Sequence, residues 1–247
     1  MRIGMNITSV TIDRSTEASG MAVVIDVLRA FTTAALAFDR GASDILLAAT
    51  VEEALALKAR FPGSLAMGEV ATLAIPEFDL SNSTAEIAKQ DLQGRRLIHR
   101  TSNGTQGVHR SVNAQELVAT GFPTASATAK YILSANPKSV TFIITGVTPD
   151  RDGDEDQACA DYIAELLRGS HPDPRPYVER VYRSDVGKWF TDPLKPEYPM
   201  EDLELATAVD GLGFAMPITR EGDLLVMRRA AELIWTRGAT NFHRLSD

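Results

Sequence analysis

The sequence predicts an α/β protein with a three-layer α/β/α architecture around a mostly parallel sheet. Two observations lead to this prediction. Short apolar runs of strand length alternate along the chain with segments of helical periodicity, and the 247 residues, 44% of them hydrophobic, suffice for one large core. Strands that alternate with helices place the helices on both faces of a parallel sheet. We therefore expect a single domain over residues 1–247.

The first strand and helix of this pattern lie near the N-terminus. Residues 21–25 form a short apolar run rich in β-branched side chains, which is typical of a strand buried on both faces. The run ends at Asp26. Apolar side chains on helical spacing then follow over residues 29–40, before Gly41, a suitable residue to end a helix. The sequence therefore predicts a strand, a turn and a helix here.

Similar units follow along the chain. A strand is expected at residues 45–48, and Thr50 with Glu53 three residues later predicts a capping box for a helix that reaches about residue 60. The other predicted strands are 65–67, 96–99, 116–119, 140–144 and 224–227, and the other predicted helices are 125–134, 155–167 and about 201–209. Residues 169–177 contain three closely spaced prolines, which predict a linker and a lobe boundary, because proline disrupts helices and central strands.

The charge of the chain narrows the classes of partner. Acidic side chains number 33 and basic ones 25, so the net charge of -8 disfavours nucleic acids and anionic membranes, and we expect neither as a partner. Residues 1–10 do not resemble a signal peptide, and no apolar run approaches the roughly 20 residues that span a bilayer. The single cysteine, Cys159, excludes an internal disulfide, so a cytoplasmic location is expected. The oligomeric state is left open, with a homodimer as one option.

Polar side chains that directly follow apolar runs are the candidates for a ligand site. In a parallel α/β sheet, ligands bind beyond the carboxyl ends of the strands. The segments of this kind are residues 26–29, 68–69, 79–83, 101–105, and 145–146 together with the acidic residues 154–156. Each one places a carboxylate, an amide or a hydroxyl group at a turn.

Together these segments resemble the 2-phosphosulfolactate phosphatase family of Mg²⁺-dependent α/β/α enzymes. The resemblance extends from about residue 22 to about residue 227. It rests on four motifs in order, Val24-Ile25-Asp26-Val27-Leu28-Arg29-Ala30, Phe78-Asp79-Leu80-Ser81-Asn82-Ser83, Thr101-Ser102-Asn103-Gly104-Thr105 and Glu155-Asp156-Gln157-Ala158-Cys159-Ala160. The sequence departs from the family's usual residues at Phe31, Ser81 and Thr84, where Thr, Gly and Pro are usual. The resemblance implies hydrolysis of 2-phosphosulfolactate to sulfolactate and phosphate, a reaction of coenzyme M biosynthesis, with a small phosphorylated organic acid as substrate.

Carboxylates dominate these candidate residues, although a phosphate monoester is itself close to a dianion at neutral pH. A cation is therefore needed between the two, and hard oxygen ligands select Mg²⁺. Such a cation polarises phosphoryl oxygens and activates a bound water. The predicted metal ligands are Asp26, Glu69 and Asp79, and the predicted catalytic residues are Asp26, Glu155 and Asp156.

Arginine, amide and hydroxyl groups are the candidates for binding the anion. Arg29 lies one turn after Asp26, and its planar guanidinium suits a phosphate, sulfonate or carboxylate group. The predicted substrate-binding residues are Arg29, Asn82, Thr101, Asn103, Gly104, Thr105 and Gly146.

Ordinary structural roles compete with each of these assignments. Asp26 is also a suitable helix cap, Arg29 a suitable partner for a surface carboxylate, and Asp79 and Asn82 are common turn residues. Glu155 and Asp156 also fit as first-turn acids that interact favourably with a helix dipole. The alternative function is a non-catalytic protein that binds a small anion on the same scaffold.

Overall fold

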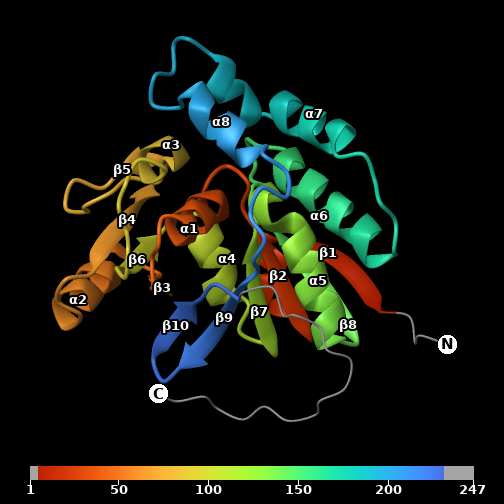
Figure 1. Ribbon diagram of the computed structural model, residues 1–247, viewed down its shortest axis with the longest axis horizontal. Coiled ribbons are helices and arrows are strands. Elements are labelled where there is room, and N and C mark those ends of the chain that lie inside the picture. The colour runs from red at the N-terminus through yellow and green to blue at the C-terminus, as the bar shows by residue number, and fades with distance from the viewer. Residues whose placement is uncertain (1–4, 231–247) are drawn as a thin grey trace.

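The computed structural model describes residues 5–230 of the chain, and a ten-stranded sheet runs through them (Figure 1). Its strands are β1 (Asn6–Thr11), β2 (Met21–Ile25), β3 (Asp44–Leu47), β4 (Leu65–Val70), β5 (Leu73–Ala74), β6 (Arg96–Arg100), β7 (Glu116–Thr120), β8 (Ser139–Ile144), β9 (Met216–Glu221) and β10 (Leu224–Met227). Their order across the sheet is β1-β8-β2-β7-β9-β10-β3-β6-β4-β5.

Two parallel blocks make up most of this sheet. Strands β1, β8, β2 and β7 pair in parallel, and so do β3, β6 and β4. The antiparallel hairpin of β9 and β10 joins the two blocks, and β5 pairs antiparallel with β4 at the edge. The predicted mostly parallel α/β sheet is confirmed, and β1, β5 and β9 are additions to the predicted strands.

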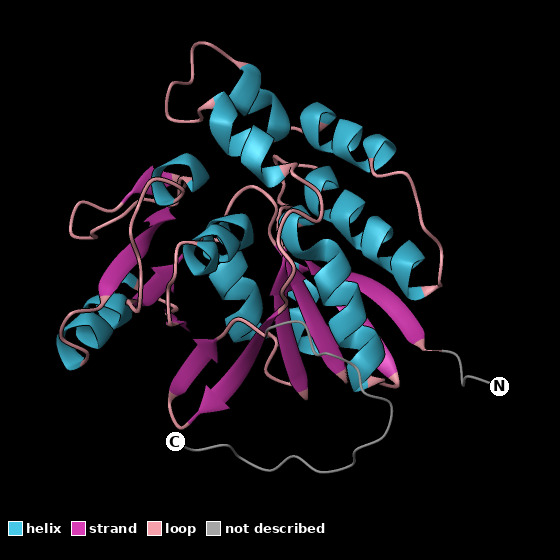
Figure 2. Ribbon diagram, viewed as in Figure 1, coloured by secondary structure: helices cyan, strands magenta, loops and turns pink. Residues whose placement is uncertain are grey.

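Helices cover both faces of the sheet (Figure 2). They are α1 (Ala30–Asp39), α2 (Val51–Arg60), α3 (Thr84–Ile87), α4 (Gly104–Arg110), α5 (Ala125–Ala135), α6 (Asp154–Leu167), α7 (Arg175–Arg183) and α8 (Met200–Ala206), with the 3-10 turns η1 (Ile12–Glu17), η2 (Phe122–Thr124) and η3 (Gly187–Thr191). Helices α5 and α6 share one apolar core with the first block, whereas α1 and α4 share the other. None of the helices within residues 5–230 is both long and apolar enough to cross a bilayer.

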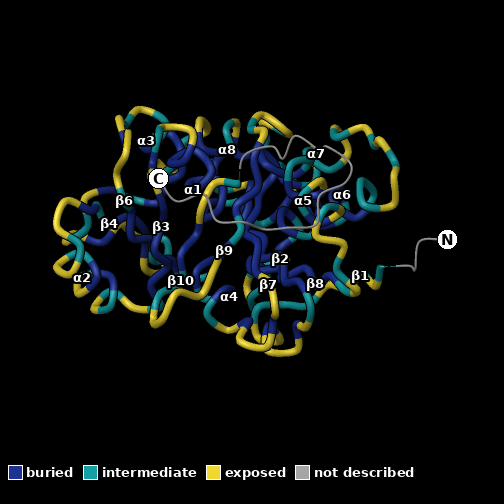
Figure 3. Tube along the Cα trace, turned by 60° about the horizontal axis from the view of Figure 1, so that its bottom comes forward, coloured by how far each residue is buried: buried dark blue, intermediate teal, exposed yellow. Residues whose placement is uncertain are grey.

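Strand β2 is buried on both faces, as its sequence predicts. Ala22 and Val24 belong to the core on the α1 side, whereas Met21, Val23 and Ile25 belong to the core on the α6 side. This alternation follows from the two-residue period of a strand. Figure 3 shows burial along the trace, with buried central strands and exposed outer loops.

The capping box predicted for α2 is present. The Thr50 side chain accepts a hydrogen bond from the Glu53 backbone N–H at 3.1 Å. The Glu53 carboxylate in turn accepts from the Ala49 N–H at 2.7 Å, one residue before the cap. These bonds satisfy N–H groups that have no partner inside the helix, and the helix therefore begins where the sequence predicts.

The chain after the proline-rich stretch returns to the middle of the sheet. Helix α7 begins inside that stretch, with Pro176 in its first turn, so the predicted linker ends where the helix begins at Arg175. Proline is tolerated there because the N–H groups of the first turn have no helical partner. Strands β9 and β10 then lie between β7 and β3, so segments on both sides of the stretch share one sheet.

Candidate active site

A pocket lies where the carboxyl ends of β2, β4 and β6 meet the segment that contains η3. Its volume is about 60 Å³, several times what a single bound water needs. The residues that line it are Asp26, Leu28, Arg29, Glu69, Ala71, Thr72, Asn82, Ser102, Asn103, Arg151, Val186, Trp189, Phe190 and Tyr198. Five of the predicted site residues are among them, namely Asp26, Arg29, Glu69, Asn82 and Asn103.

Asp26 follows β2 directly and is only 7% exposed. One carboxylate oxygen accepts a hydrogen bond from the Ala30 N–H at 2.9 Å, at the start of α1. The other faces Gly104, where an added Cβ would lie 2.8 Å from it, so a side chain at position 104 would crowd the carboxylate. Burial raises the pKa of Asp26 to about 6, and Glu69 adds to this rise while Arg151 opposes it. Asp26 therefore caps a helix and also lines the pocket.

Glu69 reaches the pocket from β4. The preceding Gly68 has φ of 142°, and a Cβ there would lie 1.8 Å from the Arg100 carbonyl oxygen, so only glycine fits. The Glu69 carboxylate accepts hydrogen bonds from the Ser102 N–H, from the Ser102 hydroxyl at 3.2 Å and from the Thr72 N–H at 2.5 Å. These bonds hold the carboxylate at the carboxyl end of β6.

Two guanidinium groups face these carboxylates. Arg29 is 8% exposed, and its Nη1 donates to the carboxylate of Asp202 at 2.6 Å. Arg151 lies over the Trp189 ring at 6.0 Å from the ring centroid. With the Asn103 amide in the orientation that satisfies both of its ends, Arg151 Nη2 donates to Asn103 at 3.1 Å. The pocket therefore has a local positive side although the chain is acidic overall.

Asn82 has its amide oriented by a buried histidine. His99 Nε2 lies 3.1 Å from the Asn82 Oδ1, and burial lowers the pKa of His99 to about 3, so the ring is neutral. This contact requires the ring proton on Nε2, because Oδ1 can only accept. The Asn82 amide N–H groups are then left to donate elsewhere. His99 Nδ1 has no hydrogen-bond partner in the described part of the chain.

The two acids at the start of α6 lie behind the pocket and do not line it. The Asp156 carboxylate accepts hydrogen bonds from the N–H groups of Val27, Thr145 and Gly146 at 2.8, 3.1 and 2.8 Å, and so links the ends of β2 and β8. Burial raises the pKa of Asp156, and Glu155 adds to the rise. Burial likewise raises the pKa of Glu155 to about 7, and its Oε2 has no partner among residues 5–230. Asp156 therefore has a structural role. It lies in the first turn of α6, and its carboxylate binds several backbone N–H groups next to the site.

Four residues predicted to bind substrate do not line the pocket and make contacts within the framework. Thr101 and Thr105 bond to each other, since each hydroxyl accepts from the other residue's N–H, at 3.1 and 2.9 Å. Both are buried, and neither lines the pocket. Gly146 uses its N–H for Asp156, as described above. Gly104 packs against Asp26 and likewise does not line the pocket.

The predicted metal ligands do not all converge. Within residues 5–230, no group of three or more His, Cys, Asp or Glu side chains could hold a metal ion. Asp79 lies outside the pocket, where its carboxylate accepts from Lys58 Nζ and from the Ala66 N–H, each at 2.7 Å. The structure therefore does not bring Asp79 together with Asp26 and Glu69 in the pocket. Mg²⁺ commonly binds through one or two carboxylates and keeps several waters, so Asp26 and Glu69 are the two predicted ligands that could hold it in this pocket.

Comparison with known proteins identifies the family of this chain. The family model described as 2-phosphosulpholactate phosphatase matches residues 7–203. This chain belongs to the 2-phosphosulpholactate phosphatase family. All of the pocket-lining residues of this family member fall inside the matched range.

Individual relatives carry a corresponding name. A protein of Bacillus subtilis (strain 168) named "Probable 2-phosphosulfolactate phosphatase" is 36% identical over 210 residues, which cover 84% of this chain and 90% of that protein. A protein of the same name from Deinococcus radiodurans is 39% identical over 148 residues, 60% of this chain and 61% of that protein. A third, from Carboxydothermus hydrogenoformans, is 39% identical over 145 residues, 59% of each chain.

Sequence reasoning missed the arginine and the aromatic side chains that complete the pocket of this family member. Arg151 lies in the loop after β8, so the rule that found the other candidates could have found it. Trp189 and Phe190 belong to η3, and Tyr198 precedes α8. Their segments have no clear periodicity, and no signal in the sequence points them toward Arg29.

Proposed function

We propose that this protein is a phosphatase that hydrolyses the phosphate ester of a small organic acid, with 2-phosphosulfolactate as substrate and Mg²⁺ as cofactor. The observation that supports it best is the pairing of two buried carboxylates, Asp26 and Glu69, with two guanidinium groups, Arg29 and Arg151, in one small pocket. Membership of the family and the names of the relatives support the same reaction.

The residues divide into a cation side and an anion side. Asp26 and Glu69 would hold Mg²⁺, which supplies positive charge to the phosphoryl oxygens. Arg29 and Arg151 bind the anionic groups of the substrate, because a guanidinium presents several N–H donors in a fixed plane. The Asn82 amide donates a further hydrogen bond, since His99 occupies its oxygen.

The aromatic wall limits the access of water to these charges. Trp189, Phe190 and Tyr198 line part of the pocket. Electrostatic interactions are stronger where water is excluded, so the wall increases the effect of each charged group on the substrate. A pocket of this size suits a small acid.

A phosphate-release assay tests the proposal. We expect release from 2-phosphosulfolactate with Mg²⁺, and none after treatment with EDTA. Arg29→Ala should raise KM, and Asp26→Asn should abolish turnover. Mg²⁺ binding, measured by calorimetry, should weaken in Asp26→Asn and in Glu69→Gln. No release from any of a panel of phosphorylated hydroxy acids would reject the phosphatase. Release that survives EDTA would reject only the role of Mg²⁺.

The alternative, a non-catalytic protein that binds a small anion, makes a different prediction in the same experiment. It expects thermal stabilisation by sulfolactate or phosphate without any turnover. A place in coenzyme M biosynthesis, a cytoplasmic location and a homodimer also remain predictions. Fractionation of cells and light scattering of the purified protein test the last two.

A further inference from the structure

We propose that Asp202 is a positioning residue, which holds the Arg29 guanidinium in the orientation that binds the substrate anion. The inference rests on the proposed phosphatase function and adds to it a residue outside the pocket. Asp202 lies in α8 and is 173 positions from Arg29 in the sequence. Its side chain is fully buried, and it does not itself line the pocket.

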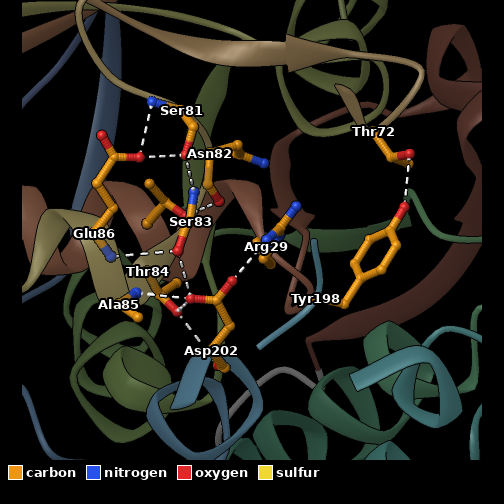
Figure 4. A network of polar contacts seen from close by, with 11 residues as sticks. Arg29, Thr72, Ser81, Asn82, Ser83, Thr84, Ala85, Glu86, Tyr198 and Asp202 are labelled. Carbon is orange, nitrogen blue, oxygen red and sulfur yellow. Dashed lines mark hydrogen bonds and ion pairs between the residues drawn. The ribbon is translucent and has the colours of Figure 1, made fainter. Parts of the chain in front are cut away.

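The Asp202 carboxylate has a fixed place because several donors hold it (Figure 4). Its Oδ1 accepts hydrogen bonds from the Ser83 hydroxyl at 2.8 Å, the Thr84 hydroxyl at 2.8 Å and the Ala85 N–H at 2.7 Å. Its Oδ2 is then directed at Arg29 Nη1, which donates at 2.6 Å. Three donors from one segment therefore determine where the fourth, the guanidinium, must lie.

The segment that holds Asp202 is itself ordered by local hydrogen bonds. The Ser81 hydroxyl donates to the Glu86 carboxylate, and the Ser83 hydroxyl accepts from the Glu86 N–H at 3.3 Å. Figure 4 shows these contacts to the left of the ion pair between Asp202 and Arg29. The start of α3 therefore holds Asp202 rigidly. Asp202 in turn fixes the position of Arg29 in the pocket.

Two aromatic rings fix the remaining freedom of Arg29. Its guanidinium carbon lies 5.6 Å from the centroid of Phe190 and 5.4 Å from that of Tyr198. The Tyr198 hydroxyl donates to the Thr72 hydroxyl at 2.7 Å, which ties this ring to the opposite wall of the pocket. Rings at these distances attract a guanidinium.

This arrangement leaves one edge of Arg29 for a ligand. Within residues 5–230 the Arg29 guanidinium makes one hydrogen bond to a protein group, from Nη1, whereas Nε and Nη2 make none. Because Arg29 lines the pocket, these donors are available to an anion there. A buried guanidinium without a partner would be costly, so Asp202 also stabilises Arg29 while no substrate is bound.

Asp202→Asn tests the positioning role, because asparagine keeps the size and one acceptor oxygen but loses the charge. We expect KM for 2-phosphosulfolactate to rise about tenfold, equivalent to about 1.4 kcal/mol, with kcat little changed. In an Arg29→Ala background, Asp202→Asn should raise KM no further, since residues that act together are not additive. Asp44→Asn is the matched control. It removes a buried carboxylate that pairs with Arg96 outside the pocket, and KM should not change.

A milder variant and a binding measurement keep the test decisive if Asp202→Asn does not fold. Thr84→Val removes one donor to Asp202 and keeps the carboxylate, and KM should rise by roughly two- to threefold, less than for loss of the charge. Calorimetry with inorganic phosphate reports the same effect without turnover, as a Kd about tenfold weaker in Asp202→Asn. If the wild type turned over no substrate, but Asp202→Asn still weakened the binding of phosphate, only the proposed function would be rejected. Unchanged KM and phosphate Kd, additivity with Arg29→Ala, or no phosphate binding by the wild type would each overturn the positioning role.

Discussion

Substitution of Asp26 by asparagine should change how the stability of the metal-free protein depends on pH. Burial raises the pKa of Asp26 from 3.8 to about 6. A shift of about two units corresponds to about 3 kcal/mol, at 1.36 kcal/mol per unit. This energy is the cost of ionising the carboxyl inside the folded protein, where Glu69 lies close and water is scarce.

The sign follows from which state holds the proton. Below pH 3.8 both the folded and the unfolded carboxyl are protonated, and the cost is absent. As the pH rises toward 6, the unfolded state ionises first, so the wild type loses stability, and the full cost is present above the folded pKa of about 6. Asparagine does not titrate. The free energy of unfolding of Asp26→Asn, relative to wild type, should therefore rise by up to about 3 kcal/mol from pH 4 to pH 8.

Urea unfolding followed by circular dichroism, in EDTA at several pH values, measures this difference. An effect of the introduced amide that does not depend on pH shifts this difference equally at every pH, so it does not change how the difference varies with pH. Glu221→Gln is a control of opposite sign, because the hydrogen bond from Arg228 lowers the pKa of Glu221 to about 2. The free energy of unfolding of Glu221→Gln, relative to wild type, should fall as the pH rises through the pKa that Glu221 has in the unfolded state. It should stay constant above about pH 6. A flat or falling difference for Asp26→Asn would show that Asp26 is not buried as described.

Two further predictions concern packing and capping. Gly104→Ala places a Cβ 2.7 Å from the Ala30 Cβ and 2.8 Å from the Asp26 carboxylate, and such overpacking should cost about 1–3 kcal/mol in urea unfolding and lower phosphatase activity. Gly211→Ala, whose added Cβ has no neighbour nearer than 3.3 Å, is its control, and equal stability of the two variants would contradict the close approach. Thr50→Ala removes the α2 cap and should cost about 1 kcal/mol of stability. It should leave kcat and KM unchanged because α2 lies outside the pocket, and an unaltered unfolding midpoint would show that the cap contributes little.

The parts of the site that the sequence predicts are those tied to the ends of strands. Asp26 and Glu69 were found because strand patterns place polar residues at the carboxyl edge of a sheet, and both line the pocket. Arg29 followed from its position one turn after Asp26. The segment of Thr101 and Thr105 lies next to the pocket residue Asn103, but their hydroxyls bond within the segment, because the direction of a hydroxyl depends on its nearest partner in space.

Other predicted site residues do not line the pocket, because their positions depend on contacts between distant segments. Asp79 follows a motif like those of the pocket residues, yet Lys58 of α2 lies beside it and binds its carboxylate. Glu155 and Asp156 lie behind Asp26, since the N–H groups at the ends of β2 and β8 surround Asp156. The periodicity of one segment does not predict which distant segment will pack against it.

The sequence by itself determined the alternation of strands and helices, the capping of α2, the two-sided burial of β2 and the acids at the strand ends, because each depends on neighbours within a few positions. Only the tertiary structure decided that Arg151, Trp189 and Tyr198 close the pocket and that Asp202 holds Arg29. Those contacts join residues far apart in the chain. Their energies come from burial and direction, which exist only after the sheet and its helices have packed.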